Sequence, residues 1–524
     1  MKQMLLASLT GLIALPVAAF AEFELTILHT NDVHARFEPI SKYDSSCSAE
    51  ANAKGECFGG YARLMTAVTQ ARARTKNSLL LDGGDQFQGS LYYTYYKGKA
   101  AAGMMNRLGY DAMAVGNHEF DDGPDVLREF MDRVSFPVLM ANADVSKEPA
   151  LRDFQKKSDI LSVGGQKIGL IGITPEDNHE LASPGKNIIF TAPAKAVQAE
   201  VDKLTKAGIN KIILLSHSGF DIDLDIARQT TGIDVIVGGH SNTYLSNSSN
   251  RAKGAYPTMI GDTAIVQAYA YGKYLGELNV SFDDDGRLVS AIGEPLLLDK
   301  HVPEDEAILA RLAVLAKPLD EIRNKVVARI SAPINGDRKV CRVQECEMGN
   351  LEAEAMLDEV ADLGVSIAIA NSGGLRASIE AGDVTMGDVL TVLPFQNTLS
   401  TFRVTGQTVI DALENGVSQI EEGKGRFPQV AGLRFSFDMS IAPNEGRISS
   451  VMVKQNGRWQ PIDLSRSYYL VSNNYVRGGG DGYRMFADAR DVYDFAPDLA
   501  DVVAGYLADQ PDYMPFTDGR IIRK

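Results

Sequence analysis

The sequence predicts a layered α/β domain followed by a second domain of α+β type. Over the first half of the chain, short runs of Val, Ile and Leu alternate with helical patterns, as in sheets whose strands are buried on both faces. The second half has a different pattern with turn signals of its own, among them the glycine-rich residues 478–482. A chain of 524 residues is also too long for one hydrophobic core and fits about two to four domains.

Five apolar runs are the predicted strands of the first domain: residues 23–28, 78–81, 112–115, 211–215 and 233–237. Helical patterns lie between them, for example at residues 63–74 and 194–207. Each run ends in polar residues that include His, Asp or Asn, which are metal-ligand types. Because ligands bind outside the carboxyl ends of strands in open α/β sheets, these polar ends are the candidate site.

A helical stretch at residues 303–325 separates the two patterns. Pro318 lies inside it and should kink or break the helix, because proline cannot donate the backbone hydrogen bond. The stretch could be a core helix, but its position between two differently patterned halves favours an interdomain linker. We therefore predict a first domain at residues 22–302 and a second at residues 326–524.

Residues 1–21 have the pattern of a signal peptide. Lys2 precedes an apolar stretch that ends near residue 19, and Ala19-Phe20-Ala21 forms an A-x-A cleavage site. A retained membrane anchor is the alternative. No later stretch reaches the roughly 18 apolar residues of a spanning helix, and residues 518–524 lack a lipid-anchor tail. The sequence thus predicts a periplasmic or secreted protein, cleaved after Ala21, with no membrane span or lipid anchor.

Four cysteines remain after this cleavage: Cys47, Cys57, Cys341 and Cys346. An even number in an exported chain favours disulfides. Three pairings are open, and we predict Cys47–Cys57 and Cys341–Cys346 because each closes a short loop. A structural zinc site is the weaker alternative, since neither pair has C-x2-C spacing or an attendant histidine.

The chain carries a net charge of −16. This acidity argues against long nucleic acid or an anionic membrane as a partner, because both require a basic face. If the protein binds phosphate groups, the attraction must come from a few local cations.

The motifs at the strand ends occur in the order Asp32-Val33-His34, Gly84-Asp85, Gly116-Asn117-His118-Glu119, His217 and Gly239-His240. This order resembles that of calcineurin-like metallophosphoesterases. Longer segments, such as residues 83–89, 116–121 and 341–351, resemble the 5′-nucleotidase family, in particular animal ecto-5′-nucleotidases, and the similarity covers essentially the whole mature chain. The signal-like start and the missing anchor tail indicate a periplasmic bacterial relative.

The resemblance implies a particular architecture. The first domain would be a four-layer α/β/β/α metallophosphoesterase domain, and the helical linker would join it to an α+β substrate-binding domain. Rotation about the linker would open and close the cleft between the two domains.

The resemblance also implies two divalent metal ions at the strand ends. Asp32 and His34 would hold one ion, Asn117, His217 and His240 would hold the other, and Asp85 would bridge both. Zinc suits this histidine-rich set, with manganese or cobalt as alternatives. A buried, hydrogen-bonded core residue is the alternative for any single histidine, but four of the seven histidines in the chain fall within the series.

By the same resemblance, His118 faces the phosphate instead of binding metal. It would stabilise the developing charge and assist the departing oxygen, with Asp121 orienting its ring. Asp122 is the adjacent alternative for the orienting role, and Glu119 is expected to be structural. The nucleophile would be a water held by the metal ions.

Substrate-binding residues are implied in both domains. Arginine forks suit phosphate oxygens, and aromatic faces stack on bases of any identity. The implied residues are Arg36, Arg342 and Arg376 for the phosphate, Phe395 and Tyr475 for the base, Asp481 for the ribose hydroxyls, and Asn371 and Asn474 for base or sugar. Asn242 follows His240 and is assigned to the phosphate or to the surroundings of the metal ions.

The predicted activity is hydrolysis of nucleoside 5′-monophosphates, such as AMP, to nucleoside and phosphate. Hydrolysis of UDP-sugars or dinucleotide pyrophosphates is one alternative, and cleavage of 2′,3′-cyclic nucleotides at the same metal site is another. A non-catalytic nucleoside-binding protein is a third. The base preference and the oligomeric state are not predicted.

Overall fold

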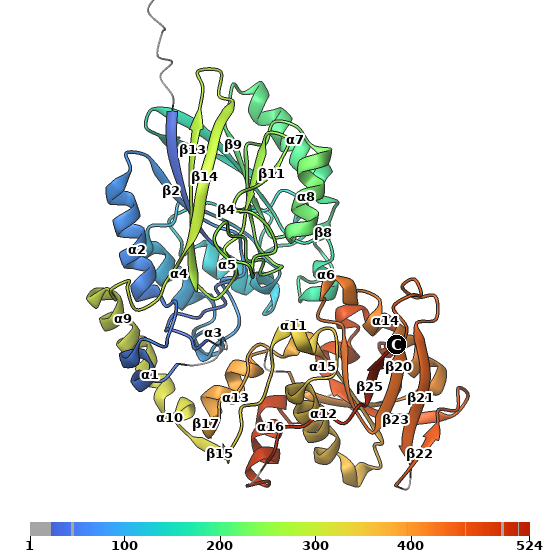
Figure 1. The fold of residues 1–524 in the computed structure, drawn as a ribbon. Helices are drawn as coiled ribbons and strands as arrows, with labels where there is room; N and C mark the ends of the chain where they lie inside the picture. The colour runs from blue at the N-terminus through green and yellow to red at the C-terminus, as the bar shows by residue number, and fades with distance from the viewer. Residues whose placement is uncertain are drawn as a thin grey trace, which may run out of the picture.

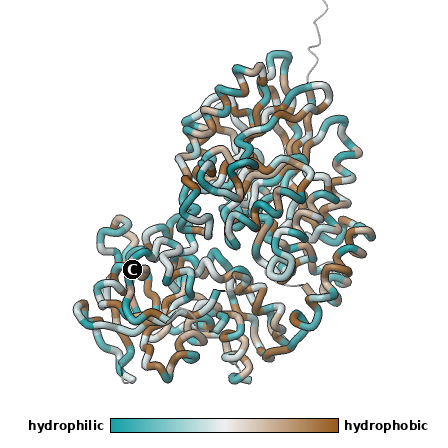
Figure 2. The backbone as a smooth tube through the Cα atoms, turned by 180° about the vertical axis from the view of Figure 1, so that it is seen from behind, coloured by the Kyte–Doolittle hydropathy of each residue, from teal (hydrophilic) through white to brown (hydrophobic). Residues whose placement is uncertain are grey.

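The computed structural model describes residues 23–42, 44, 47–395, 397–455, 457–493, 497–511 and 513–524. They form two lobes joined by a short helical segment, with the N-terminal lobe at the top of Figure 1. Hydrophobic segments run through both lobes (Figure 2), and each lobe has buried clusters of its own. The predicted signal peptide, residues 1–21, lies outside the described residues.

Two six-stranded sheets form the centre of the N-terminal lobe. The first contains, in spatial order, β14 (Leu288–Leu297), β13 (Tyr274–Phe282), β1 (Phe23–Thr30), β2 (Ser78–Asp82), β3 (Ala112–Ala114) and β4 (Val138–Leu139). The second contains β11 (Thr258–Ile260), β12 (Thr263–Val266), β10 (Val235–Gly238), β9 (Ile212–Ser216), β7 (Gln166–Ile173) and β6 (Ser158–Val163). The five predicted strands are present as β1, β2, β3, β9 and β10. They pair in parallel within their sheets, so their carboxyl ends meet at one edge of each sheet.

Helices cover the outer faces of both sheets (Figure 1). The first sheet is covered by α2 (Tyr61–Arg74), α4 (Gly98–Leu108) and α5 (Pro124–Met131), and the second by α7 (Pro193–Lys206) and α8 (Phe220–Gln229). On β1, Leu28 packs on the helix side whereas Leu25 and Ile27 pack between the sheets. A strand buried on both faces is apolar throughout, which explains the continuous pattern in the sequence. The four-layer arrangement is confirmed.

The helical connection breaks at the predicted proline. Helix α9 (Glu306–Ala316) ends before Pro318, a 3-10 turn follows at Lys317–Leu319, and α10 (Asp320–Arg323) completes the segment. The side chains of Ile308, Leu312 and Leu315 on α9 are buried with the helices of the N-terminal lobe. Helix α9 therefore packs as part of that lobe, and the domain boundaries stay a prediction.

The C-terminal lobe is of α+β type. Its central sheet contains β19 (Pro428–Ala431), β16 (Ile367–Asn371), β23 (Ser467–Asn473), β18 (Leu399–Thr405) and β24 (Arg490–Tyr493). Helices α12 (Glu347–Glu359) and α16 (Leu499–Ala508) cover one face, and α14 (Gly406–Val417) packs on the other. A four-stranded sheet of β22 (Arg458–Pro461), β21 (Ile448–Gln455), β20 (Leu433–Phe437) and β25 (Ile521–Arg523) extends the α14 side, while β15 (Val326–Ile330) pairs with β17 (Gly382–Thr385).

Both predicted disulfides, Cys47–Cys57 and Cys341–Cys346, are present. Within the described ranges, no helix combines the length and the apolar character needed to cross a membrane.

Candidate metal centre

The polar ends of the parallel strands meet around Asp85, which follows β2. Its Oδ2 lies 3.0 Å from Nε2 of His217 and 3.9 Å from Nε2 of His34. The same nitrogen of His34 is 3.9 Å from Oδ1 of Asp32. All four side chains are buried, so the carboxylates and imidazoles share a site with little access to water.

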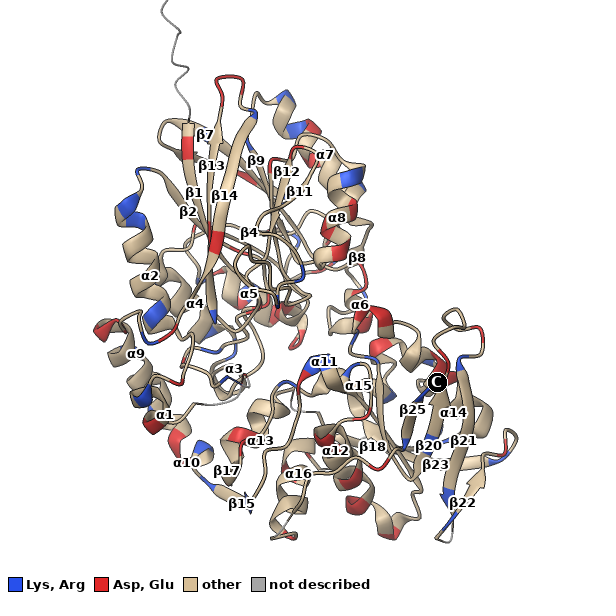
Figure 3. Ribbon diagram, in the orientation of Figure 1, with Lys and Arg blue, Asp and Glu red and all other residues tan. Residues whose placement is uncertain are grey.

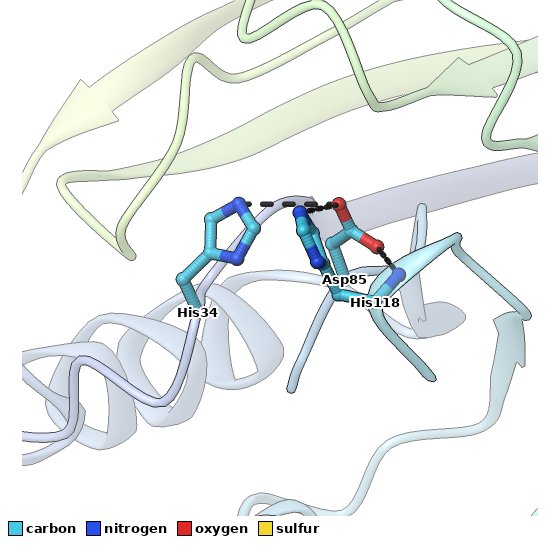
Figure 4. A group of neighbouring side chains, drawn as sticks. All are labelled: His34, Asp85 and His118. Atoms are coloured by element: carbon cyan, nitrogen blue, oxygen red, sulfur yellow. Dashed lines mark hydrogen bonds and ion pairs between the residues drawn. The ribbon is translucent and has the colours of Figure 1, made fainter. Parts of the chain in front are cut away.

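Two groups of candidate ligands share Asp85. One contains His34, Asp85 and His118, and the other contains Asp85, His217 and His240; within each group the ligand atoms lie within 4.8 Å of one another. The rings of His34 and His118 are both directed at the Asp85 carboxylate (Figure 4). Asn117 joins the second group, since its Oδ1 lies 2.9 Å from Nδ1 of His240. The structure thus brings all six predicted metal ligands together.

The hydrogen bonds around the centre leave lone pairs for a cation. The Nδ1 atoms of His34 and His217 lie 3.1 and 2.6 Å from the carbonyl oxygens of Phe87 and Gly83. Because a carbonyl only accepts, these nitrogens donate, so that in the neutral form of each ring the lone pair lies on Nε2, the nitrogen nearer Asp85. Oδ1 of Asp32 is buried without a hydrogen-bond partner. This donor set of imidazoles and carboxylates fits divalent metal ions.

The shifted pKa values of two candidate ligands, His217 and Asp85, also favour a cation at this centre. Burial acts to lower the pKa of His217, but Asp85 outweighs it and raises the pKa to about 10. Burial acts to raise the pKa of Asp85, but His217 and His118 hold it well below its ordinary value. The pair therefore favours a positive charge between its two members, which a metal ion supplies when bound.

The motif glycines are required by the close packing of these ligands. A Cβ at Gly116 would lie 2.2 Å from Oδ1 of Asp85, and one at Gly84 would lie 2.6 Å from Nδ1 of His217. The ligands themselves are strained: φ is 50° at Asp32, 54° at His34, 60° at Asp85 and 70° at His240. Left-handed backbone at non-glycine residues costs about 1–3 kcal/mol each, and such residues cluster at functional sites.

Glu119 organises the loop that carries Asp85. Its carboxylate accepts hydrogen bonds from the backbone N–H groups of Asp85, Gln86, Phe87 and Gly116, at 2.6 to 3.1 Å. The side chain is fully buried, and burial raises its pKa to about 7. Its geometry is that of a structural residue, as the sequence predicted.

His118 is held in place by Asp121. Its Nδ1 lies 2.7 Å from Oδ2 of Asp121, and its Nε2 lies 3.9 Å from Oδ2 of Asp85. Burial acts to lower the pKa of His118, but Asp121 and Asp85 outweigh it and raise the pKa. Asp122 instead accepts hydrogen bonds from Tyr93 and Lys97, so the geometry favours Asp121 over Asp122 as the orienting residue.

The predicted residues of the second lobe meet this centre at a cavity of about 1010 Å³ between the lobes. Its wall includes Asn242 beside the centre and, from the C-terminal lobe, Arg342, Asn371, Arg376, Phe395, Asn474, Tyr475 and Asp481. Asn371 donates to Asp481 at 2.7 Å, and the Tyr475 hydroxyl lies 3.4 Å from the same carboxylate. The wall thus combines aromatic rings, amides and a carboxylate on the side opposite the metal ligands.

Arg376 and Phe395 reach across to the metal centre. Nη2 of Arg376 lies 3.0 Å from Nε2 of His34. The ring of Phe395 lies 5.5 Å from the ring of His118 and 5.4 Å from the guanidinium of Arg376. Arg36 differs from the expectation: its side chain is outside the cavity wall, donates to the carbonyl of Asp44 and lies 5.2 Å from the Tyr271 ring.

The cavity wall also contains residues that were not predicted, among them two charged ones, Arg338 and Glu180. Arg338 lies one helical turn before Arg342, and the spacing of four, which places both on one helix face, is the signal that could have found it. Glu180, on α6 (Asn178–Leu181), lies 3.3 Å from Arg426 and also pairs with Arg484. No sequence signal connects Glu180 to arginines more than two hundred residues away.

Two protein-family models and several characterised proteins match this chain, and the proteins match it over nearly its whole length. A family model described as calcineurin-like phosphoesterase matches residues 25–244, and one described as the C-terminal domain of 5′-nucleotidase matches residues 326–488. A 5′-nucleotidase from Diplobatis ommata is 39% identical over 98% of this chain and 92% of its own length.

Two solved structures show the same relationship. A 5′-nucleotidase precursor from Thermus thermophilus has a TM-score of 0.91 and 39% identity, covering 96% of this chain and 99% of that one. The NAD nucleotidase of Haemophilus influenzae has a TM-score of 0.58 and 27% identity, covering 96% of this chain and 100% of that one.

Proposed function

The chain belongs to the 5′-nucleotidase family, and from this premise we propose that it hydrolyses nucleoside 5′-monophosphates, such as AMP, to nucleoside and phosphate. One observation carries the proposal: a single cavity joins the His/Asp cluster of the N-terminal lobe to the aromatic and amide residues of the C-terminal lobe. The phosphate would lie at the cluster and the nucleoside against the second lobe, so the substrate would bridge both.

Two divalent metal ions would be held by the clustered ligands. Asp32 and His34 would bind one, Asn117, His217 and His240 the other, and Asp85 both. When bound, such ions neutralise phosphate charge and activate water as a nucleophile. We propose zinc because of the histidine content, with manganese or cobalt as alternatives.

The side chains around the phosphate have distinct tasks in this proposal. His118 presents Nε2 to the centre and would stabilise the charge on the departing 5′-oxygen, while Asp121 fixes the ring through Nδ1. Arg342 and Arg376 would bind phosphate oxygens as guanidinium forks. Phe395 and Tyr475 would stack on the base, and Asp481, held by Asn371, would accept hydrogen bonds from the ribose.

We also propose an exported location, periplasmic or secreted. Two disulfides support it, because disulfides persist in oxidising compartments.

The test is a phosphate-release panel of AMP, UMP, UDP-glucose and 2′,3′-cyclic AMP, run with and without a chelator. We expect fast release from the two monophosphates and loss of activity on chelation. Faster turnover of the sugar nucleotide or the cyclic ester would favour those alternative substrates. Tight AMP binding without phosphate release would establish a non-catalytic binding protein instead.

A further inference from the structure

Helix α6 is a part of the N-terminal lobe that reaches the end of the cavity assigned to the nucleoside. In Figure 3 it lies beside the C-terminal lobe, against the glycine-rich turn that carries Asp481. The helix is anchored in its own lobe, because the amide of the fully buried Asn178 donates to the Thr174 hydroxyl at 2.8 Å. Residues 179–183 line the cavity. One lobe therefore supplies a piece of the wall around the nucleoside-binding residues of the other.

The Glu180 carboxylate of this helix forms ion pairs with two arginines of the C-terminal lobe. Arg426 lies 3.3 Å away, and Arg484 also pairs with it. The Arg426 side chain is 12% exposed and that of Arg484 is 76% exposed, so solvent screens the Arg426 pair less. Arg426 donates to Oδ1 of Asn415 at 3.2 Å, and the Asn415 amide donates to the carbonyl of Asp481 at 3.1 Å. These contacts connect Glu180 to the turn that carries Asp481.

The Tyr475 hydroxyl makes a second connection between the helix and the same turn. It donates to the backbone carbonyl of Glu180 and accepts from the backbone N–H of Asp481, the latter at 3.1 Å. A Cβ at Gly480 would lie 2.4 Å from Cζ of Tyr475, so the ring rests directly on the turn. Asp481 has left-handed backbone, with φ of 51°, and such backbone persists only where its surroundings hold it.

We propose that Glu180 is a positioning residue for nucleoside binding, which holds Tyr475 and Asp481 in place from the opposite lobe. The inference rests on the proposed function, in which Tyr475 stacks on the base and Asp481 binds the ribose. Glu180 acts through these residues and through Arg426, and it need not touch the nucleotide. Because its partners belong to the other lobe, the nucleoside end of the cavity is fully ordered only when the lobes approach each other as they do here.

The test is calorimetric titration of the metal-loaded full-length protein with two probes. Adenosine would fill only the nucleoside end of the cavity, and inorganic phosphate would fill only the metal end. The variants are Glu180→Ala and Tyr475→Phe, which keeps the ring and removes the hydroxyl. Asp221→Ala is the matched control, because Asp221 also lines the cavity from the N-terminal lobe but pairs with Lys253 of its own lobe. The melting temperature of each variant shows whether it is folded.

We expect both variants to bind adenosine roughly 2–10-fold more weakly, as for the loss of two partly exposed ion pairs or of one hydroxyl contact, with phosphate binding near the wild-type value. Adenosine carries no charge, yet its binding to the wild-type chain should weaken from about 0.05 M to about 0.5 M sodium chloride, because salt screens the ion pairs of Glu180. Glu180→Ala should not show this salt dependence. A residue that only stabilised the fold would not produce it.

Three results would overturn the inference. They are wild-type adenosine binding by a folded Glu180→Ala protein, an equal loss of adenosine and phosphate binding in that variant, and an equal loss of adenosine binding in Asp221→Ala. If Glu180→Ala does not fold, the salt dependence of the wild-type chain and the affinity of Tyr475→Phe decide the question, and wild-type affinity in Tyr475→Phe or binding unaffected by salt would then overturn it. Failure of the proposed function is separate, because it appears as absence of phosphate release from AMP by the wild-type protein.

Discussion

Nδ1 of His118 lies 2.7 Å from Oδ2 of Asp121, while the neighbouring Asp122 turns away to bind Tyr93 and Lys97. This contrast between adjacent carboxylates provides a matched pair of variants.

We expect His118→Ala to retain its metal ions and to lower kcat for AMP by roughly 10²–10⁴-fold, because a positioned imidazole contributes about that much to acid–base catalysis. Asp121→Asn should also lower kcat, whereas Asp122→Asn, the control, should not. Steady-state kinetics with metal analysis of each variant would check this. Near-normal turnover by His118→Ala would remove its catalytic role.

Phe395 is predicted to bind the base. Truncation to Ala should chiefly raise KM for nucleotides, because the lost ring is a binding surface. The binding free energy lost would be roughly 1–3 kcal/mol, the value of one base–aromatic stacking contact. Phe395→Tyr keeps the ring and should restore a KM near that of the wild type. An unchanged KM in Phe395→Ala would make Phe395 a packing residue.

Glu119 is the sole acceptor shown for four backbone N–H groups of the metal-binding loops. Glu119→Ala leaves these donors buried and unpaired, at about 1–3 kcal/mol each. We expect a lower melting temperature together with fewer than two metal ions per chain. Glu119→Gln retains one acceptor oxygen, so its melting temperature and metal content should lie between those of Glu119→Ala and those of the wild type. A fully metallated Glu119→Ala protein with wild-type stability would contradict this role.

Glu352 on α12 predicts a pH-dependent stability. Both of its carboxyl oxygens are buried without a hydrogen-bond partner, and burial raises its pKa from 4.5 to about 8. The fold therefore favours the neutral acid, and this contribution is present below pH 4.5 and is lost as the pH rises through 8. Since Glu352→Gln cannot ionise, its melting temperature should rise relative to that of the wild type across this window.

The size of the Glu352 effect is bounded by about 1.4 kcal/mol for each unit of pKa shift. Melting temperatures are measured at intervals across the window. Glu359→Gln, which changes an exposed carboxyl of the same helix, is the control and should show no such trend. A constant difference between Glu352→Gln and the wild type would contradict the prediction.

Glu180 links the two lobes through Arg426 and Arg484, and its backbone carbonyl accepts from the Tyr475 hydroxyl. Removing its carboxylate by Glu180→Ala should loosen the contact between the two lobes, since each such ion pair contributes about 0.2–1 kcal/mol. Small-angle scattering should then give a larger radius of gyration.

The control for Glu180 is Glu129→Ala, which breaks the exposed ion pair of Glu129 with Lys99 inside the N-terminal lobe. It should leave the radius of gyration unchanged. An equal change in both variants, or none in Glu180→Ala, would show that the Glu180 contacts do not hold the lobes together.

Much of the N-terminal lobe could be predicted from local pattern. Strands such as β1 are apolar on both faces because helices and a second sheet cover them, and that burial is visible in the sequence. The ligands could be predicted for a related reason. Parallel strands end at a common edge, so His217 after β9 and Asp85 after β2 must approach each other once the sheets pack.

Contacts that depend on how one segment turns relative to another could not be predicted from local sequence pattern. The sequence places Asp121 and Asp122 side by side and offers no means to tell which one faces His118. It also gives Arg36 a motif position, although the side chain packs on Tyr271, outside the cavity wall. The sequence predicts helix α9 as part of a linker because of its place in the chain, yet its apolar face is buried in the N-terminal lobe.

By itself, the sequence determined the layered fold, the two disulfides and the ordered set of candidate metal ligands, because each depends on short-range pattern and on strand ends that share one edge. Only the tertiary structure decided that Glu180 meets Arg426 and Tyr475. The physical reason is that these groups come from separate lobes, and the relative placement of two lobes is set by the packing of whole surfaces, which no local pattern records.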